Sequence, residues 1–306
     1  MAGNKKLQAD LILLLAAFLW GTTFIFQRQA MDNLSPFAYT GVRFLLATLV
    51  LLPLAFFRVR RARRENGLRK VAGLWVCGCL GAGLFLFVGM TFQQYGLVWT
   101  TAGKAGFITS LYVVIVPLLL LVAGRGIQFG EIVGAILAAV GLYLLSFTDS
   151  FSLSRGDFLV LVGAFVWAGH VLFIGWVSPK VDPVVIGTGQ ALVCGVLGLC
   201  GAAVLGELPT LAAIQASWLD IVWGGVLSVA VGFTLQVAGQ RHAGPAAAAI
   251  ILQMEAVIAA LTGWVVLGES MTTKMICGAV VMLTGFLLSQ LWPILMKGRK
   301  GITPGP

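Results

Sequence analysis

A single carboxylate, Glu255, lies in the middle of a long apolar run and is the costliest residue of this sequence to bury. It falls about nine residues into the segment 246–267, or roughly 14 Å deep in a helix. The stretch Leu252–Ile258 around it offers no counter-charge. An isolated carboxylate at that depth could exchange a proton with whichever side of a membrane its cavity faces. The alternative is a structural glutamate that an Arg or Lys of another helix pairs permanently.

Two basic residues and one proline are candidates for charge pairing or gating. Arg43 lies about seven residues into its predicted helix, roughly 10 Å deep, and matches the depth of Glu255 better than Lys104 does. Lys104 lies near a helix start, where its side chain can reach the surface, so an interfacial anchor or cap explains it as well as gating does. Pro117 removes a backbone hydrogen bond later in the same segment, and we expect a gating kink there.

Aromatic and polar side chains at mid-depth could line a cavity together with this glutamate. Two tryptophans lie too deep for the interfacial belt that explains most membrane tryptophans. His170 follows Trp167 by three residues on the same helix face, where it either contacts substrate or a proton, or simply bonds to a neighbouring helix. The candidate substrate-binding or cavity-lining residues are Trp20, Thr23, Tyr112, Trp167, His170 and Glu255.

Catalytic and nucleotide-binding patterns are absent from the sequence. It contains no Gly-x4-Gly-Lys-Ser/Thr, no His-Glu-x-x-His and no Gly-x-Ser-x-Gly motif. The five cysteines lie inside apolar runs without Cys-x-x-Cys spacing, and we interpret them as packing residues. We therefore expect no enzyme activity, no catalytic residue, no cofactor and no metal site.

The composition places the chain in a lipid bilayer. Of its 306 residues, 59% are hydrophobic and only 10% are charged, too little polar surface for a soluble globule. Apolar runs long enough to cross about 30 Å of hydrocarbon recur along nearly the whole length. We predict ten transmembrane helices, at 9–30, 36–57, 71–96, 101–123, 129–147, 157–177, 183–205, 217–239, 246–267 and 273–293.

The net charge of +9 does not indicate nucleic-acid binding, because the distribution of the basic residues along the chain instead indicates the orientation in the membrane. Seven of the twenty basic residues lie in the short stretch Arg58–Lys70 between two apolar runs. On the predicted spans, fifteen basic residues fall on the side of the two termini and three on the opposite side. Because positive charge is retained on the cytoplasmic side, both termini are predicted to be cytoplasmic.

The sequence also repeats itself. Residues 156–183 follow the pattern of residues 9–36 at an offset of 147, so that Trp20 matches Trp167. At an offset near 143, Tyr112 falls opposite Glu255, and the matched helices each present a polar group at mid-depth. An odd number of helices in each copy makes the second copy enter the membrane from the opposite side, which predicts inverted repeats around a cavity.

This organisation predicts an all-α integral membrane fold of ten transmembrane helices in two inverted five-helix repeats. The first repeat covers residues 1–147 and the second covers residues 157–293. A short serine-rich periplasmic linker, 148–156, joins them, and residues 294–306 form a cytoplasmic tail. The ionisable groups are not duplicated: Arg43 aligns with Gln190. The unmatched residues are therefore candidates for the site.

Several short motifs together resemble the drug/metabolite transporter superfamily, in particular its EamA-type exporters with ten helices. The order and spacing of these motifs across nearly the whole chain carry the resemblance. The motifs are Leu19–Thr23, Ser35–Pro36 with Arg43–Phe44, Thr100–Gly103 with Ser110–Tyr112 and Pro117, and Glu255–Val257. Where members of the family often carry Glu-Pro-Val, this chain has Ala256 in place of the proline.

The resemblance implies export of small metabolites, and the chain is similar to amino-acid exporters of the YddG type. We expect a secondary transporter of small amphipathic solutes, foremost hydrophobic or aromatic amino acids, working by alternating access with proton or substrate exchange. The alternatives are a multidrug or cationic-compound exporter, or a non-transporting scaffold subunit. The expected location is a bacterial inner membrane. The expected partners are a small-molecule substrate and the lipid bilayer, without nucleic acid, for a monomer or weak homodimer.

Overall fold

The computed structural model describes residues 2–66, 72–100, 102–146, 154–267 and 271–300, and every regular element within them is a helix. The first half contains α1 (Ala2–Ala30), α2 (Pro36–Asn66), α3 (Ala72–Trp99), α4 (Ala102–Ser110), α5 (Tyr112–Val122) and α6 (Phe129–Ser146). The second half begins with α7 (Arg155–Val177), α8 (Pro183–Val204), α9 (Leu211–Ala216) and α10 (Trp218–Val222). It continues with the π-helix η2 (Trp223–Phe233), α11 (Thr234–Gln240), α12 (Pro245–Leu252), α13 (Met254–Leu267) and α14 (Thr273–Lys300).

The helices confirm the predicted membrane fold. Within the described residues, nine spans are long and apolar enough to cross a bilayer, and a shorter apolar helix covers Phe129–Leu144. Three of the nine spans combine several helical elements: α4 with α5, α10 with η2 and α11, and α12 with α13. Counted in chain order together with the shorter helix Phe129–Leu144, which makes ten spans in the described residues, these are the fourth, eighth and ninth spans. The chain is a multi-pass membrane protein with five spans in each half.

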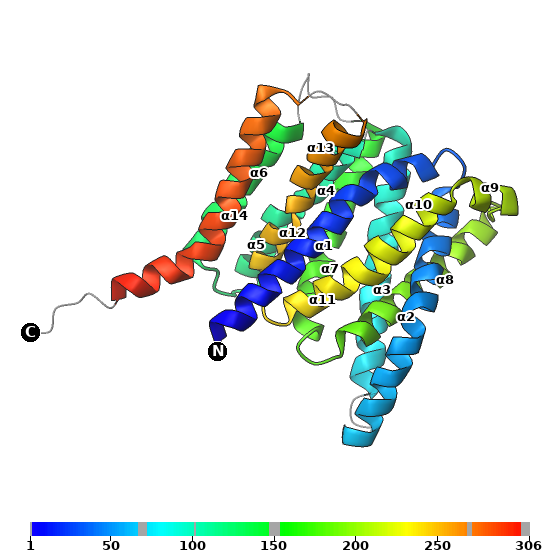
Figure 1. Ribbon diagram of the computed structural model, residues 1–306, viewed down its shortest axis with the longest axis horizontal. Helices are drawn as coiled ribbons and strands as arrows, with labels where there is room; N and C mark the ends of the chain where they lie inside the picture. Colours follow the sequence, from blue (N-terminus) through cyan, green and yellow to red (C-terminus); the bar gives the residue numbers. More distant parts are fainter. Residues whose placement is uncertain (1, 67–71, 101, 147–153, 268–270, 301–306) are drawn as a thin grey trace, which may run out of the picture.

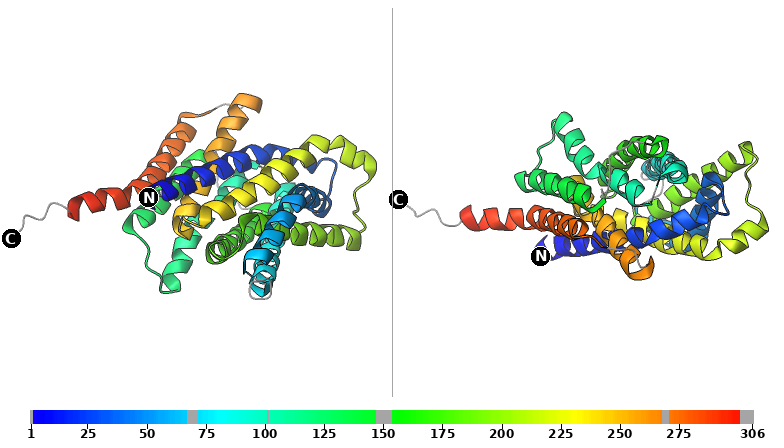
Figure 2. Two further views of the ribbon diagram at one scale, coloured as in Figure 1. Left: turned by 60° about the horizontal axis from the view of Figure 1, so that its bottom comes forward. Right: turned by 90° about the horizontal axis from the view of Figure 1, so that it is seen from above.

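The two halves contact each other mainly through corresponding helices. The α6 helix lies along α14, and α2 lies along α8, so each of these contacts joins a helix to its own counterpart (Figure 1; Figure 2). The contact of α3 with α7 is matched by the contact of the eighth span with α1. The beginning of α1 and the end of α14 lie at the same end of the bundle (Figure 1). This pattern of contacts is that of an inverted repeat.

The fourth and ninth spans both break, at positions that differ by one residue from exact correspondence at the 143-residue offset. The fourth span turns at Leu111, where both Val114 and Ile115 donate backbone hydrogen bonds to the Leu111 carbonyl at 3.0 and 3.2 Å. The ninth span turns at Gln253, 142 positions later. Pro117 lies inside α5, six residues after this break, and its role in a gating kink stays a prediction. A proline is not required, since the ninth span breaks beside Ala256.

Symmetry fails in the eighth span. Its counterpart, α3, is a regular α-helix, whereas η2 holds eleven residues in π-helical geometry. A π-helix this long is rare in proteins, and such segments frequently occur at functional sites. Parts of the predicted organisation lie outside the described residues, namely 148–153 of the linker and 301–306 of the tail. The last helix, predicted to end at 293, continues to Lys300.

Candidate functional site

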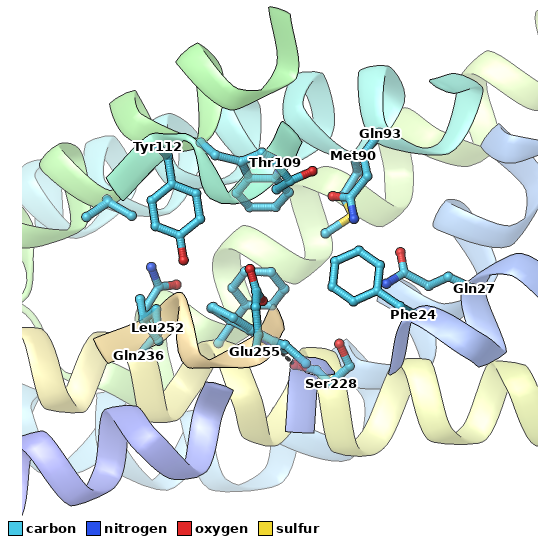
Figure 3. A pocket seen from close by; sticks show the side chains of 14 residues that line it. Phe24, Gln27, Met90, Gln93, Thr109, Tyr112, Ser228, Gln236, Leu252 and Glu255 are labelled. Carbon is cyan, nitrogen blue, oxygen red and sulfur yellow. Dashed lines mark hydrogen bonds between the residues drawn. The ribbon is translucent and has the colours of Figure 1, made fainter. Parts of the chain in front are cut away.

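A narrow cavity lies inside the bundle between the two halves (Figure 3). The empty volume between the side chains is about 500 Å³, which includes space that is open to the outside, and only about 40 Å³ of it is wide enough for water. The cavity is therefore a slot for a few waters rather than an open chamber. Its lining residues are Trp20, Phe24, Gln27, Met90, Gln93, Thr109, Tyr112, Trp167, Val171, Ser228, Phe233, Gln236, Leu252 and Glu255.

The internal repeat relates all but two of these lining residues to one another. Pairs from α1 and α7 are 147 positions apart, and pairs from α3 to α5 and their counterparts are 143 positions apart. Gln27 and Ser228 have no lining counterpart. The cavity therefore lies on the pseudo-twofold axis between the halves. The pairs are Trp20 with Trp167, Phe24 with Val171, Met90 with Phe233, Gln93 with Gln236, Thr109 with Leu252, and Tyr112 with Glu255.

Each predicted tryptophan packs against a glycine of the opposite half. A Cβ atom at Gly232 would lie 2.6 Å from the Trp20 Nε1 atom, and a Cβ at Gly89 would lie 3.1 Å from Trp167 Cε2. The Trp20 indole donates a hydrogen bond to the Ser228 carbonyl at 3.1 Å. The two rings therefore reach the cavity only because glycine leaves room for them.

We predict that Gly232→Ala lowers stability more than Gly89→Ala does. The Gly232 variant must displace the hydrogen-bonded Trp20 indole, and overpacking of this kind costs about 1–3 kcal/mol. The contact at Gly89 is longer and can be relieved by a few tenths of an ångström. Thermal unfolding of both purified variants in the same detergent measures the difference. Equal melting temperatures for the two variants would show that the indole moves without cost.

Glu255 lies in the first turn of α13, directly after the break at Gln253, and its carboxylate points into the cavity (Figure 3). The residue is 5% exposed. Among the side chains that the structure describes, none forms a hydrogen bond or salt bridge with it. Tyr112, its counterpart in the first half, reaches the same space with a buried hydroxyl that has no hydrogen-bond partner.

The charge-pair candidates are not joined to Glu255 in this conformation. Arg43 is fully buried, and its guanidinium contacts Gln27 and Met90 instead. Lys104 belongs to α4, but its side chain lies outside the part of the structure that is described. Its role as an anchor or in gating stays a prediction.

Two of the six predicted lining residues are buried but do not line the cavity. His170 is fully buried, with its Nε2 atom 3.2 Å from Gln190 Oε1 and its ring edge-on to Trp167. The Thr23 hydroxyl donates to the Leu19 carbonyl at 2.6 Å. Trp20, Tyr112, Trp167 and Glu255 line the cavity. Thr23 and His170 each come three residues after a lining tryptophan. The residues that come four positions after each tryptophan, Phe24 and Val171, line the cavity instead.

The sequence analysis did not predict the glutamine side chains that line the cavity. Gln93 and Gln236 face the cavity from matched positions of α3 and α11, and Gln27 adds a third amide from α1. The missed hydrophobic residues, Phe24, Met90, Val171, Phe233 and Leu252, complete the wall. The 143-residue offset, applied to the third and eighth spans, is the signal that finds the two matched glutamines.

The cavity offers binding chemistry. Buried polar atoms without a hydrogen-bond partner line it: Thr109 Oγ1, Tyr112 Oη, Trp167 Nε1 and Gln236 Oε1. Together with the carboxylate and the aromatic rings, they can hold a small solute by hydrogen bonds and ring contacts. Over the described part of the chain, no three His, Cys, Asp or Glu side chains gather as a metal site would require.

Comparison with known proteins decides the family. The model of the EamA-like transporter family matches residues 7–147 and again residues 154–291. The chain belongs to the EamA-like transporter family. An uncharacterized transporter of Archaeoglobus fulgidus is 31% identical over 293 residues, covering 94% of this chain and 88% of that protein.

A second curated relative and a solved structure are also similar to this chain. The uncharacterized inner membrane transporter YedA of Escherichia coli K12 is 24% identical over 297 residues, covering 94% of this chain and 92% of that protein. A crystal structure of a protein with 19% identity covers 93% of this chain and 97% of its own, with a TM-score of 0.75, and shows the same fold. As an EamA-like protein, the chain is a membrane transporter, and the two curated relatives named here are called transporters.

Proposed function

We propose that this EamA-like protein exports hydrophobic or aromatic amino acids by alternating access and exchanges them for protons through Glu255. The observation that carries the proposal is the cavity on the pseudo-twofold axis, with a carboxylate at its centre and aromatic rings on its walls. In inverted-repeat transporters, a site between the repeats faces each side in turn as the halves rock.

The lining chemistry supports this substrate class. Four aromatic side chains besides Tyr112 line the slot, and the polar groups among them are mainly neutral amides and hydroxyls. Such walls suit an amphipathic solute of modest size. Phosphate esters call for clustered Arg or Lys at the site, and none of the lining residues is basic. Because the slot holds only a few waters, substrate entry requires the halves or their side chains to move apart.

Counterflow of labelled amino acids in proteoliposomes, with and without a pH gradient, tests the proposal. We expect saturable uptake of at least one hydrophobic or aromatic amino acid, accelerated by unlabelled substrate on the other side and altered by the gradient. The absence of saturable uptake across a broad panel would overturn the transport function. Saturable exchange of cationic dyes without exchange of amino acids would overturn the substrate class, and unsaturable flux would indicate a channel.

We also propose a bacterial inner-membrane location with both termini cytoplasmic, residues 1–147 and 157–293 as the two repeats, 148–156 as a periplasmic linker and 294–306 as a cytoplasmic tail. The surplus of basic residues on the side of the termini supports this orientation. A reporter that folds only in the cytoplasm, fused to the C-terminus, tests it. If the reporter is inactive at the C-terminus but active when it is fused at the linker, the protein has the opposite orientation in the membrane.

A further inference from the structure

Arg43 is a buried cation whose hydrogen-bonding capacity is largely unused. Its Nε and Nη1 atoms are buried and have no hydrogen-bond partner. Its Nη2 atom lies 3.4 Å from Gln27 Oε1, which is long for a hydrogen bond, and 2.9 Å from the thioether of Met90, a weak acceptor. The rings of Tyr39 and Phe44, at 4.6 and 5.3 Å, attract the cation, and the Tyr39 hydroxyl offers the guanidinium a neutral acceptor rather than an anion.

The carboxylates around this position do not compensate the charge. Among the described side chains, no salt bridge reaches Arg43. Asp220 packs close by, since its backbone carbonyl accepts the Tyr39 hydroxyl at 3.1 Å, yet its carboxylate forms no salt bridge with the guanidinium. Glu255 makes none either. A buried guanidinium is costly without a hydrogen-bonded anion, so this arrangement is suited to a state in which an anion is present.

The cavity gives an anion access to this guanidinium. Gln27 and Met90, the two contacts of Nη2, both line the cavity at the end that also holds Phe24 and Gln93 (Figure 3). Both side chains are unbranched and flexible, so the contacts that separate the guanidinium from the cavity can rearrange when a ligand enters.

The second half has no equivalent charge. The counterparts of Gln27 and Arg43 at an offset of 147 are Ile174 and Gln190. Gln190 pairs with His170 rather than with a cavity residue. One end of the cavity therefore has a cation behind its wall, while the central Glu255 supplies the opposite charge. The two charges give the slot a polarity that fits a zwitterion.

We propose that Arg43 binds the α-carboxylate of the transported amino acid, which displaces the Gln27 amide, while the ammonium group faces Glu255. This inference rests on the proposed amino-acid transport. It makes Arg43 a specificity-determining residue: a free carboxylate is required, and decarboxylated amines and esters are poor ligands. Arginine suits this role because its planar fork matches a carboxylate with two parallel hydrogen bonds.

Calorimetric titration of the full-length protein in nanodiscs with L-phenylalanine and with 2-phenylethylamine tests the assignment, because these probes differ only in the carboxylate. Wild type should bind L-phenylalanine at least about tenfold more tightly than the amine. Arg43→Gln should weaken binding of L-phenylalanine about 10- to 100-fold and change binding of the amine less than about threefold. The fold already accommodates glutamine at the matched position 190.

Two further variants separate recognition from packing. Tyr39→Phe changes the surroundings of Arg43 and keeps the cation, so its discrimination between the two probes should equal that of wild type. If Arg43→Gln does not yield monodisperse protein, Arg43→Lys replaces the fork by a point charge and should lose part of the discrimination.

If the Arg43 variants lose binding of both probes equally, or discriminate between the two probes as wild type does, Arg43 does not bind the carboxylate. Either result leaves the proposed amino-acid transport standing. Wild type that neither binds nor exchanges any amino acid overturns the proposed function, and this inference with it.

Discussion

Replacing Glu255 by glutamine is expected to abolish the effect of a pH gradient on counterflow and to reduce transport to the level of empty liposomes. The carboxylate has no bonded partner among the described side chains and faces the cavity, so it can take up and release a proton there. Glutamine has nearly the same shape but cannot change its charge. Initial rates of labelled amino-acid uptake at several gradients measure the loss.

An acidic residue outside the cavity provides the control. Glu131 lies in the first turn of α6, where its Oε2 atom accepts the Gln128 backbone N–H at 3.1 Å. Glu131→Gln should transport like wild type at every gradient. If Glu255→Gln is instead lost to aggregation, the carboxylate is structural, as expected of a scaffold subunit. A variant that keeps the full pH response would remove Glu255 from the proton pathway.

Gly21→Ala is expected to lower both stability and transport, because it separates α1 from the broken ninth span. A Cβ atom at Gly21 would lie 2.6 Å from the backbone carbonyl oxygen of Glu255 and 2.8 Å from Ile258 Cβ. Backbone cannot rotate away as a side chain does, so the helices must shift. Overpacking of this kind costs about 1–3 kcal/mol, and the shift also moves the carboxylate from its place in the cavity.

The matched control is Gly106→Ala on α4, where the added Cβ would meet only Phe24 Cζ at 4.0 Å, an ordinary contact. Melting temperature and counterflow rate of the two variants are compared with wild type. We expect both values to fall for Gly21→Ala and to stay close to wild type for Gly106→Ala. A Gly21→Ala protein with unchanged melting temperature and rate would mean that α1 and α13 separate freely.

Hydrophobicity and internal repetition were sufficient to predict the fold. The thickness of the bilayer sets the length that an apolar segment needs to cross it, so the spans can be found from the lengths of the apolar runs. An odd number of spans in each copy inverts the second copy relative to the first. The helix breaks could not be located in this way. Pro117 drew attention to the fourth span, yet the turn lies at Leu111, and the ninth span turns without a proline. The π-helical geometry of η2 likewise has no sequence signal that we can identify.

The sequence indicated how deep in the membrane the candidate residues lie, but not which side chains point into the cavity. Trp20 and Trp167 were found because the repeat marks them and their depth excludes the interfacial belt. His170 was proposed for the wall because it shares a helix face with Trp167, and Thr23 is its counterpart in the repeat, whereas the residues that line the cavity next to the tryptophans are Phe24 and Val171. Because the repeat relates the two positions, both lie in the same place relative to the cavity, and a role for either one in transport stays a prediction.

The breaks at Leu111 and Gln253 have a consequence for the resting state of the transporter. If the two halves exchange conformations to open the opposite side, residues that are identical at matched positions contribute equally to both states and cancel. Only unlike pairs can favour one facing direction. At the 143-residue offset Gln253 corresponds to Ser110: the Gln253 amide donates to the Ala138 carbonyl at 3.2 Å, whereas the buried Ser110 hydroxyl has no hydrogen-bond partner. The differences between the two copies thus set the free-energy gap between the inward-facing and outward-facing states, and substitutions that make the copies alike should bring that gap toward zero.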